Sequence, residues 1–187
     1  MLLDLTLKVN ADQNKEITSP QRIAAFGHLG THFDAMGKEF SLDNFRRQGK
    51  LVNVSAIVDR EIGIDDFRDT TIVEKDFVLL YTGFIERISY GSQEYFKTHP
   101  QLSMQAVDYL IQKKISMIGI DAAGLRRGSE HPKMDQHCAD HDVFVVENLV
   151  NLGELWRKSV GRAITLYTLP ANIAGLTGLP CRVVAEF

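Results

Sequence analysis

The stretch HLGTHFDA, residues 28–35, is the part of the sequence from which both fold and function can be argued. It places two histidines and an aspartate, His28, His32 and Asp34, within a short segment. Neutral imidazole and carboxylate groups together suit a divalent first-row metal such as zinc or manganese. Gly30 permits a tight backbone bend, so that three nearby side chains can face one centre. The stretch therefore predicts a metal site with three protein ligands and an open position for water.

A different interpretation is that His28 and His32 are surface residues one turn apart on a helix. Their spacing allows this, but Gly30 and Thr31 lie between them and make a poor helix. Short ligand motifs also arise by chance. From these residues alone, both interpretations stay open.

The same stretch resembles the signature of the cyclase family of metal-dependent hydrolases, which includes bacterial kynurenine formamidase and isatin hydrolase. The family pattern is H-x-G-T-H-x-D-x-P-x-H. The first three ligands match here, whereas Met36 stands in place of the proline and Lys38 in place of the last histidine. The resemblance thus favours metal binding by the first three ligands and leaves a question about the fourth.

Further segments resemble the family in the same order along nearly the whole chain, at residues 119–121, 146–152 and 169–185. The resemblance implies an α/β fold of the swivelling β/β/α type. It implies a single domain over residues 1–187, with a mixed, barrel-like sheet flanked by helices. It also implies a homodimer or a larger homo-oligomer.

In family members with two metals, the second is held by the last signature histidine, a later histidine and the glutamate of a Glu-Asn-Leu segment. Glu147 matches that glutamate. Family spacing counts back twelve residues from it to Asp135, and His137 lies two residues further on. Two residues turn a helix by about 200°, so both cannot face the site. Either Asp135 occupies the site, or a local deletion brings His137 into it as a ligand.

One physical hypothesis accounts for both Lys38 and Asp135. The ammonium of Lys38 would lie where the second metal lies in relatives, held by Asp135 and Glu147, because an unpaired buried charge is costly. This hypothesis predicts a single metal. The alternative is that Lys38 is an ordinary solvated surface lysine. His131 precedes a proline, so it is expected on an extended or turn segment and not among the ligands.

Length and composition narrow the class of protein. The 187 residues are 44% hydrophobic and 24% charged, as in an ordinary globular domain. The net charge of −3 provides no basic surface for nucleic acid or an anionic membrane. Two cysteines without a motif favour a reducing compartment. Without a secretory signal or a long apolar run at hand, a cytoplasmic location is expected.

Hydrophobic patterning predicts the remaining elements. Strands are expected at 3–9, 51–58, 77–81, 116–120, 143–146, 162–169 and 181–187. Helices are expected at 42–47, 100–114, 133–140 and, as a turn and short helix, 148–156. Loops or irregular segments are expected at 10–18, 85–98 and 170–178. Helices that alternate with strands in this way indicate an α/β protein.

The leading functional hypothesis is a metal-dependent hydrolase that cleaves a carbon–nitrogen bond of a small amide, formamide or lactam. The metal would polarise the carbonyl and activate water. Glu147 or Asp135 would accept and deliver protons, and Lys38 would stabilise the oxyanion or the leaving group. Two alternatives stay open: a lyase or cyclase that uses the same metal, and a non-catalytic relative that binds a small molecule or metal. The expected partner is a small-molecule substrate.

Overall fold

Strand β4, Phe77–Tyr81, is apolar and almost completely buried, as expected of a strand covered on both faces. Its alternate residues enter two different hydrophobic cores. Val78 and Leu80 pack in one core, and Phe77 and Leu79 pack in the other. Successive side chains of a strand point to opposite faces, so the sheet that contains β4 separates two apolar layers.

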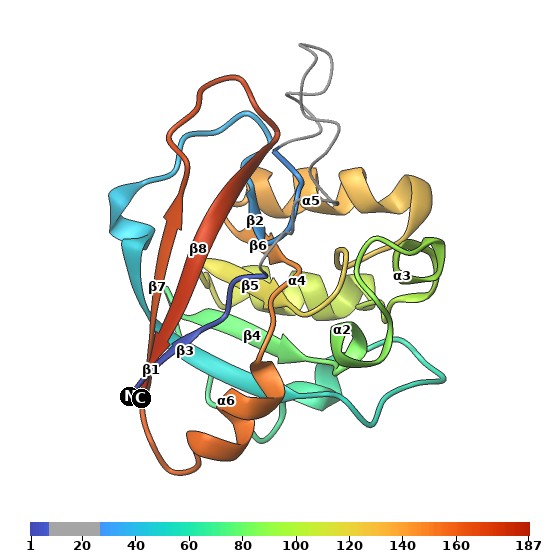
Figure 1. Ribbon diagram of the computed structural model, residues 1–187, viewed down its shortest axis with the longest axis vertical. Helices are drawn as coiled ribbons and strands as arrows, with labels where there is room; N and C mark the ends of the chain where they lie inside the picture. The colour runs from blue at the N-terminus through green and yellow to red at the C-terminus, as the bar shows by residue number, and fades with distance from the viewer. Residues whose placement is uncertain (8–26) are drawn as a thin grey trace.

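The computed structural model contains such a sheet and describes residues 1–7 and 27–187 (Figure 1). The predicted loop at 10–18 and the end of the first predicted strand, residues 8–9, lie outside the described residues. The strands are β1 Leu2–Asp4, β2 His32–Asp34, β3 Arg46–Asn53, β4 Phe77–Tyr81, β5 Met117–Ile120, β6 Phe144–Glu147, β7 Ile164–Pro170 and β8 Gly178–Glu186.

The sheet closes on itself as a mixed barrel. Its order is β1-β8-β2-β6-β5-β4-β3-β7, and β7 pairs again with β8. Seven strands therefore form a ring, with β1 attached to β8. The β3–β4, β4–β5 and β5–β6 pairs are parallel, and the other pairs are antiparallel. The predicted α/β fold with a mixed, barrel-like sheet is confirmed.

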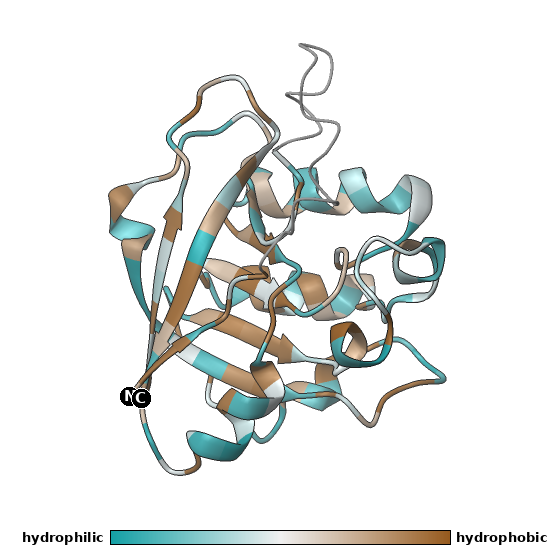
Figure 2. Ribbon diagram, in the orientation of Figure 1, coloured by the Kyte–Doolittle hydropathy of each residue, from teal (hydrophilic) through white to brown (hydrophobic). Residues whose placement is uncertain are grey.

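Helices pack against the ring and supply its outer layer. The α-helices are α2 Phe84–Arg87, α3 Gln93–Thr98, α4 Met104–Gln112, α5 His131–Asp140 and α6 Leu152–Lys158. The 3-10 helices are η2 Leu42–Phe45, η3 Ile64–Phe67 and η4 Gly128–Glu130. Buried residues of α4 and α5 join the core that covers one face of the parallel strands. Figure 2 shows the hydrophobic central strands beside the more hydrophilic surfaces of α5 and α6.

Several local predictions need correction. The segment 85–98, predicted to be irregular, contains α2 and α3; the Ser92 side chain caps α3 by accepting a hydrogen bond from the Tyr95 N–H. Strand β3 begins at Arg46 and ends at Asn53, so the predicted strand 51–58 was placed too late. The helix predicted at 100–114 is shorter, since α4 begins at Met104 and ends at Gln112; the Ser103 side chain caps it by accepting a hydrogen bond from the Ala106 N–H.

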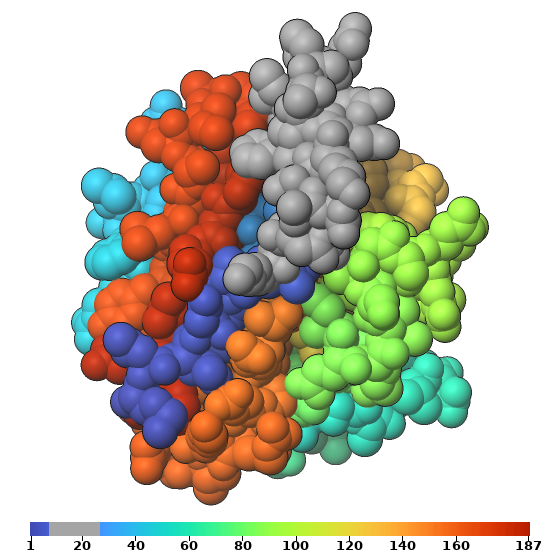
Figure 3. All heavy atoms as spheres, viewed as in Figure 1, coloured from blue at the N-terminus to red at the C-terminus, as the bar shows by residue number. Residues whose placement is uncertain are grey.

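Strands β1 and β8 bring the two ends of the sequence together. In Figure 3, the blue N-terminal residues lie beside the orange and red C-terminal segments. The terminal amine of Met1 donates a hydrogen bond to the Phe187 carbonyl at 2.8 Å. Across the described ranges, every helix is too short or too polar to cross a membrane.

Candidate metal centre

The side chains of His28, His32 and Asp34 converge because strand β2 follows directly after the turn that contains His28. His32 and Asp34 are two residues apart on β2, so their side chains leave the same face of the strand. His28 approaches from the preceding turn. Its Nδ1 lies 3.1 Å from His32 Nε2 and 3.3 Å from Asp34 Oδ1, and His32 Nε2 lies 3.3 Å from the same oxygen. These three residues are called the first cluster below.

The first cluster fits a divalent cation. A tetrahedral site with metal–ligand bonds of about 2.0–2.1 Å places neighbouring donor atoms about 3.3–3.4 Å apart, close to the observed spacing. Asp34 is 1% exposed, and within the described ranges neither of its side-chain oxygens has a hydrogen-bond partner. A buried carboxylate that accepts no hydrogen bond is costly unless a nearby cation neutralises it. The donor set of two nitrogens and an oxygen is one that zinc and manganese accept.

A second cluster lies beside the first. His131 and Asp135 are one turn apart at the start of α5, and Glu147 ends β6. His131 Nε2 lies 3.0 Å from Asp135 Oδ2 and 2.9 Å from Glu147 Oε1. The other Glu147 oxygen, Oε2, lies 3.5 Å from His32 Nε2 and joins the two clusters. Each cluster places one donor atom from each of its three residues within 4.8 Å of one another.

The barrel register explains why the clusters meet. Strand β2 pairs antiparallel with β6, and His32 is directly opposite Glu147. Directly opposed residues of an antiparallel pair have side chains on the same face, close together. After Glu147, the backbone of Asn148 takes the left-handed conformation with φ 57°, which ends the strand. The position of Glu147 at the site is therefore a consequence of strand pairing.

Two glycines keep space for these side chains. A Cβ on Gly178 of β8 would lie 2.7 Å from His28 Cε1. A Cβ on Gly124 would lie 2.9 Å from Glu147 Oε1 and 3.0 Å from His131 Cε1, and its φ of 107° also favours glycine. Any larger residue at either position would push a cluster side chain out of place.

The charges in this site strongly perturb one another. Burial opposes a positive charge on His32, but the Asp34 and Glu147 carboxylates outweigh it and raise the pKa of His32 to about 9. Burial also opposes charge on His131, but contacts with Asp135 and Glu147 raise its pKa to about 11. Burial and the nearby carboxylates of Asp34 and Glu147 raise the pKa of Asp135 to about 7. Three buried carboxylates thus create a field that attracts cations.

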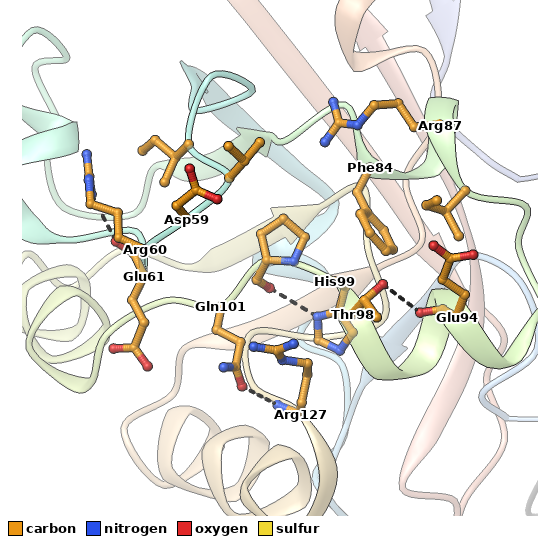
Figure 4. A pocket seen from close by; sticks show the side chains of 14 residues that line it. Asp59, Arg60, Glu61, Phe84, Arg87, Glu94, Thr98, His99, Gln101 and Arg127 are labelled. Atoms are coloured by element: carbon orange, nitrogen blue, oxygen red, sulfur yellow. Dashed lines mark hydrogen bonds between the residues drawn. The ribbon is translucent and has the colours of Figure 1, made fainter.

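Every residue of the two clusters except the buried Asp34 lines a cavity of about 360 Å³. Met36, Phe96 and Pro132 contribute apolar surface to its wall. A larger cavity of about 610 Å³ lies elsewhere and contains no residue of either cluster (Figure 4). Its charged side chains include Arg60, Arg87 and Arg127, interspersed with acidic groups. Size therefore does not select the candidate site, whereas the convergence of donor atoms does.

Known proteins resemble this chain in sequence and in fold. Residues 3–126 match the model of the Cyclase family, described as "Putative cyclase". The chain belongs to the Cyclase family. The matched part contains the first cluster and ends before His131, Asp135 and Glu147.

Individual relatives of this Cyclase-family chain are distant in sequence. The uncharacterized protein MJ0783 of Methanocaldococcus jannaschii is 28% identical over 161 residues, which cover 84% of this chain and 77% of that protein. The structure of a predicted metal-dependent hydrolase from Bacillus stearothermophilus is 21% identical with a TM-score of 0.73, covering 99% of this chain and 97% of that one. Isatin hydrolase A from Ralstonia solanacearum is 19% identical with a TM-score of 0.75, covering 99% and 91%. These two structures share the fold.

Lys38, at the last position of the Cyclase signature, does not reach the clusters. Its Nζ donates to the Ala139 carbonyl and lies 2.9 Å from Asp142 Oδ1, at the far end of α5. The side chain is 36% exposed and that of Asp142 is 85% exposed. The hypothesis that the Lys38 ammonium lies between Asp135 and Glu147 is therefore wrong. Nothing in its observed contacts supports the oxyanion role predicted for it.

The choice between Asp135 and His137 is settled by their directions on α5. Asp135 faces the cavity, whereas His137 Nε2 lies 2.9 Å from Asp108 Oδ1, away from both clusters. His137 is thus not brought to the site. The expectation that Asp135 and His137, two residues apart on a helix, cannot both face the site is confirmed.

His131 is a residue of the site that the sequence did not predict. It was excluded because a proline follows it, and the residue before a proline avoids the helical conformation in most contexts. Here Pro132 is in the first turn of α5, where a backbone N–H has no helical partner to lose. The signal that could have found His131 is its spacing, since it lies one helical turn before Asp135.

Proposed function

We propose that this protein is a metal-dependent hydrolase that cleaves a carbon–nitrogen bond of a small amide, formamide or lactam. The observation that carries this proposal is the convergence of His28, His32 and Asp34, in which the buried Asp34 carboxylate faces two imidazole nitrogens at 3.3 Å but accepts no hydrogen bond within the described ranges. Relatives described as a metal-dependent hydrolase and as an isatin hydrolase support the reaction class.

The first cluster would hold one divalent ion, zinc or manganese. When bound, such an ion supplies Lewis-acid polarisation of a carbonyl and a reactive hydroxide at neutral pH. His28 remains 38% exposed, so the cluster opens to the cavity on that side, where a substrate carbonyl can approach. The volume of about 360 Å³ and the apolar wall favour a small, partly apolar molecule.

Glu147 is the residue best placed to accept and return protons. Its Oε2 lies beside the first cluster, 3.5 Å from His32 Nε2, and its Oε1 contacts His131. His131 connects Glu147 with Asp135, so the second cluster forms a buried chain of ionisable groups that can relay a proton away. In this arrangement His131 takes the role that the sequence suggested for Lys38, since it is the cationic partner of Asp135 and Glu147.

A second metal is the alternative that a specific observation favours. His131, Asp135 and Glu147 also place three donor atoms close together, and among the described residues Asp135 Oδ1 has no hydrogen-bond partner. Metal analysis of the purified protein at saturating zinc or manganese decides between the two. One ion per chain is expected, and two ions would assign the second cluster to metal binding.

The proposed activity is tested with metal-loaded protein and a panel of amides, formamides and lactams, beside esters and substrates of lyases and cyclases. Turnover of a C–N substrate that is lost on chelation and in His32→Ala is expected. Metal binding without turnover of any substrate would favour a non-catalytic binding protein. Turnover only of the lyase or cyclase substrates would favour that alternative. Assembly into a homodimer or larger homo-oligomer and a cytoplasmic location stay predictions.

A further inference from the structure

Gly30, between the two histidines of the first cluster, is held by side chains from other parts of the chain. Its N–H donates to the Tyr90 hydroxyl at 2.8 Å. Its carbonyl accepts from Asn148 Nδ2 at 3.0 Å and from His32 Nδ1 at 2.9 Å. Both acceptor positions of this carbonyl are therefore used. The Tyr95 hydroxyl continues the chain by donating to Asn148 Oδ1 at 2.8 Å.

These contacts fix the protonation pattern of His32. A carbonyl oxygen only accepts, so Nδ1 of His32 must carry the hydrogen that it donates to Gly30. In the neutral ring, Nε2 then has the free lone pair, and Nε2 is the atom that faces His28 and Asp34. A metal ligand needs this pattern, because the bound nitrogen must be unprotonated.

The orientation of Asn148 follows from the same carbonyl. If its amide were turned over, two oxygens would face each other at Gly30, so Nδ2 points to Gly30 and Oδ1 points to Tyr95. Asn148 is 2% exposed and Tyr95 is fully buried, which protects this short chain of hydrogen bonds from water. The backbone carbonyl of Asn148 also accepts from the Thr31 hydroxyl at 2.8 Å. Asn148 thus holds the Gly30 carbonyl through its side chain and the Thr31 hydroxyl through its backbone, and these two residues directly precede His32.

We propose that Asn148 and Tyr95 are positioning residues that aim His32 Nε2 at the bound metal through the Gly30 carbonyl. This inference rests on the proposed function, because it needs the first cluster to bind a metal. Tyr95 acts through Asn148, and Asn148 acts through the Gly30 carbonyl. Asn148 Nδ2 also lies 3.5 Å from His32 Nδ1, the ring nitrogen that would not bind the metal. The aromatic segment around α3 therefore has a task in the metal centre beyond packing.

The test measures metal affinity directly, with Co²⁺ and Zn²⁺ as probes and the visible spectrum of bound Co²⁺ as the signature of ligand geometry. Tyr95→Phe removes only the hydroxyl. Asn148→Gly removes the amide but keeps a residue that adopts the left-handed backbone. Removal of such outer-shell partners typically weakens metal affinity about 10–100-fold. We expect about 10-fold for Tyr95→Phe, a larger loss for Asn148→Gly, and an altered Co²⁺ spectrum in both.

A second readout follows the hydrogen bond itself. In the zinc-loaded protein labelled with ¹⁵N-histidine, the Nδ1–H of His32 should exchange slowly with solvent. Exchange should become faster in both variants. Tyr95→Phe also remains informative if Asn148→Gly fails to fold.

Two controls separate positioning from general loss of stability. Val107→Ala creates a cavity in the core beneath α4, in the cluster that also contains Tyr95, but removes no hydrogen-bonding group, and Tyr109→Phe removes a tyrosine hydroxyl from the same helix. Both should retain the wild-type affinity and Co²⁺ spectrum. Equal affinity and an unchanged spectrum in Tyr95→Phe and Asn148→Gly would overturn the inference. Absence of metal binding by the wild-type protein would instead reject the proposed function.

Discussion

The two halves of the candidate metal centre are built in different ways. The first cluster comes from one short stretch of sequence, and the turn and strand β2 bring its donors together locally. The second cluster takes two residues from α5 and one from the end of β6, so it exists only when the barrel and helix have formed. Donors contributed by a local motif can be identified from sequence, whereas donors assembled by the fold require the structure.

The difference in composition suggests a difference in task. The first cluster has two imidazoles and one carboxylate, and the second has one imidazole and two carboxylates. Neutral nitrogen donors suit tight binding of zinc, whereas two carboxylates around one imidazole suit the holding and transfer of protons. The following predictions test this division of labour.

The largest effect is expected from His32→Ala. His32 Nε2 lies within 3.5 Å of donor atoms of His28, Asp34 and Glu147, and its loss should weaken metal affinity by more than about 100-fold, beyond the usual effect of an outer-shell partner. Turnover should fall to background. His131→Ala is the matched variant in the second cluster and should keep metal affinity within about 10-fold. Isothermal titration with zinc measures the metal affinity of both variants. Equal loss of affinity in His131→Ala and His32→Ala would contradict the proposed division of labour between the two clusters.

Glu147→Gln should separate metal binding from catalysis. The amide is of the same size but cannot accept a proton as the carboxylate does, so turnover should fall by at least about 100-fold. Metal affinity should change little if Glu147 is not a ligand. Asp135→Asn is the matched control one step further along the proposed proton relay and should lose less activity. Comparison of turnover with metal content in each variant checks this, and loss of metal in Glu147→Gln would place that carboxylate among the ligands.

The metal-free protein should become less stable as pH rises from about 6 to 9. The raised pKa values of His32, about 9, and His131, about 11, mean that their protonated forms stabilise the fold below pH 6.5 and that this contribution is lost as pH rises through those values. Asp135, with its pKa raised to about 7, adds a loss because its buried charge forms near that pH.

Metal binding should reverse this trend, because the ligands must be deprotonated and affinity therefore increases with pH. Thermal unfolding with EDTA and with excess zinc, across this pH interval, measures both trends. The expected gain in melting temperature from zinc is larger at pH 9 than at pH 6. A metal-free protein whose stability increased over this interval would contradict the charge arrangement described for the two clusters.

The smallest effect is expected from Lys38→Ala. The pair with Asp142 is largely exposed, so its loss should cost less than about 1 kcal/mol in the free energy of unfolding. Turnover and metal content should match the wild type within about twofold. A loss of activity comparable to that of Glu147→Gln would show that Lys38 reaches the site in the working enzyme, and would restore the role that its observed contacts argue against.

Sequence reasoning succeeded where the physical signal is local. The strand Phe77–Tyr81 is marked by an unbroken apolar run, and α4 by its Ser103 cap and by Val107 and Leu110 at helical spacing. Strand β2 was missed because three residues are too short to show alternation, and its partners β6 and β8 are distant in sequence.

The candidate site could be predicted in the same uneven way. His28, His32 and Asp34 follow from residue type and spacing alone, and the structure brings them together. His131 has a spacing of one helical turn from Asp135, but this spacing places it at the site only if α5 begins one residue before Pro132, which the sequence did not indicate. The orientation of Lys38 away from Asp135 could not be predicted either. A substitution in a signature shows which residue is absent, but it does not show which neighbours the new side chain contacts.

Strand β2 has one more consequence. It supplies two donors of the first cluster and is also the shortest strand of the closed ring, with three residues between β6 and β8. A cation bound there would stabilise the pairing of β2 with its neighbours β6 and β8. Removal of the cation by a chelating agent would then first increase the rate of amide exchange in β2 and in the neighbouring residues of β6 and β8. This local opening would occur under conditions in which the chain as a whole stays folded.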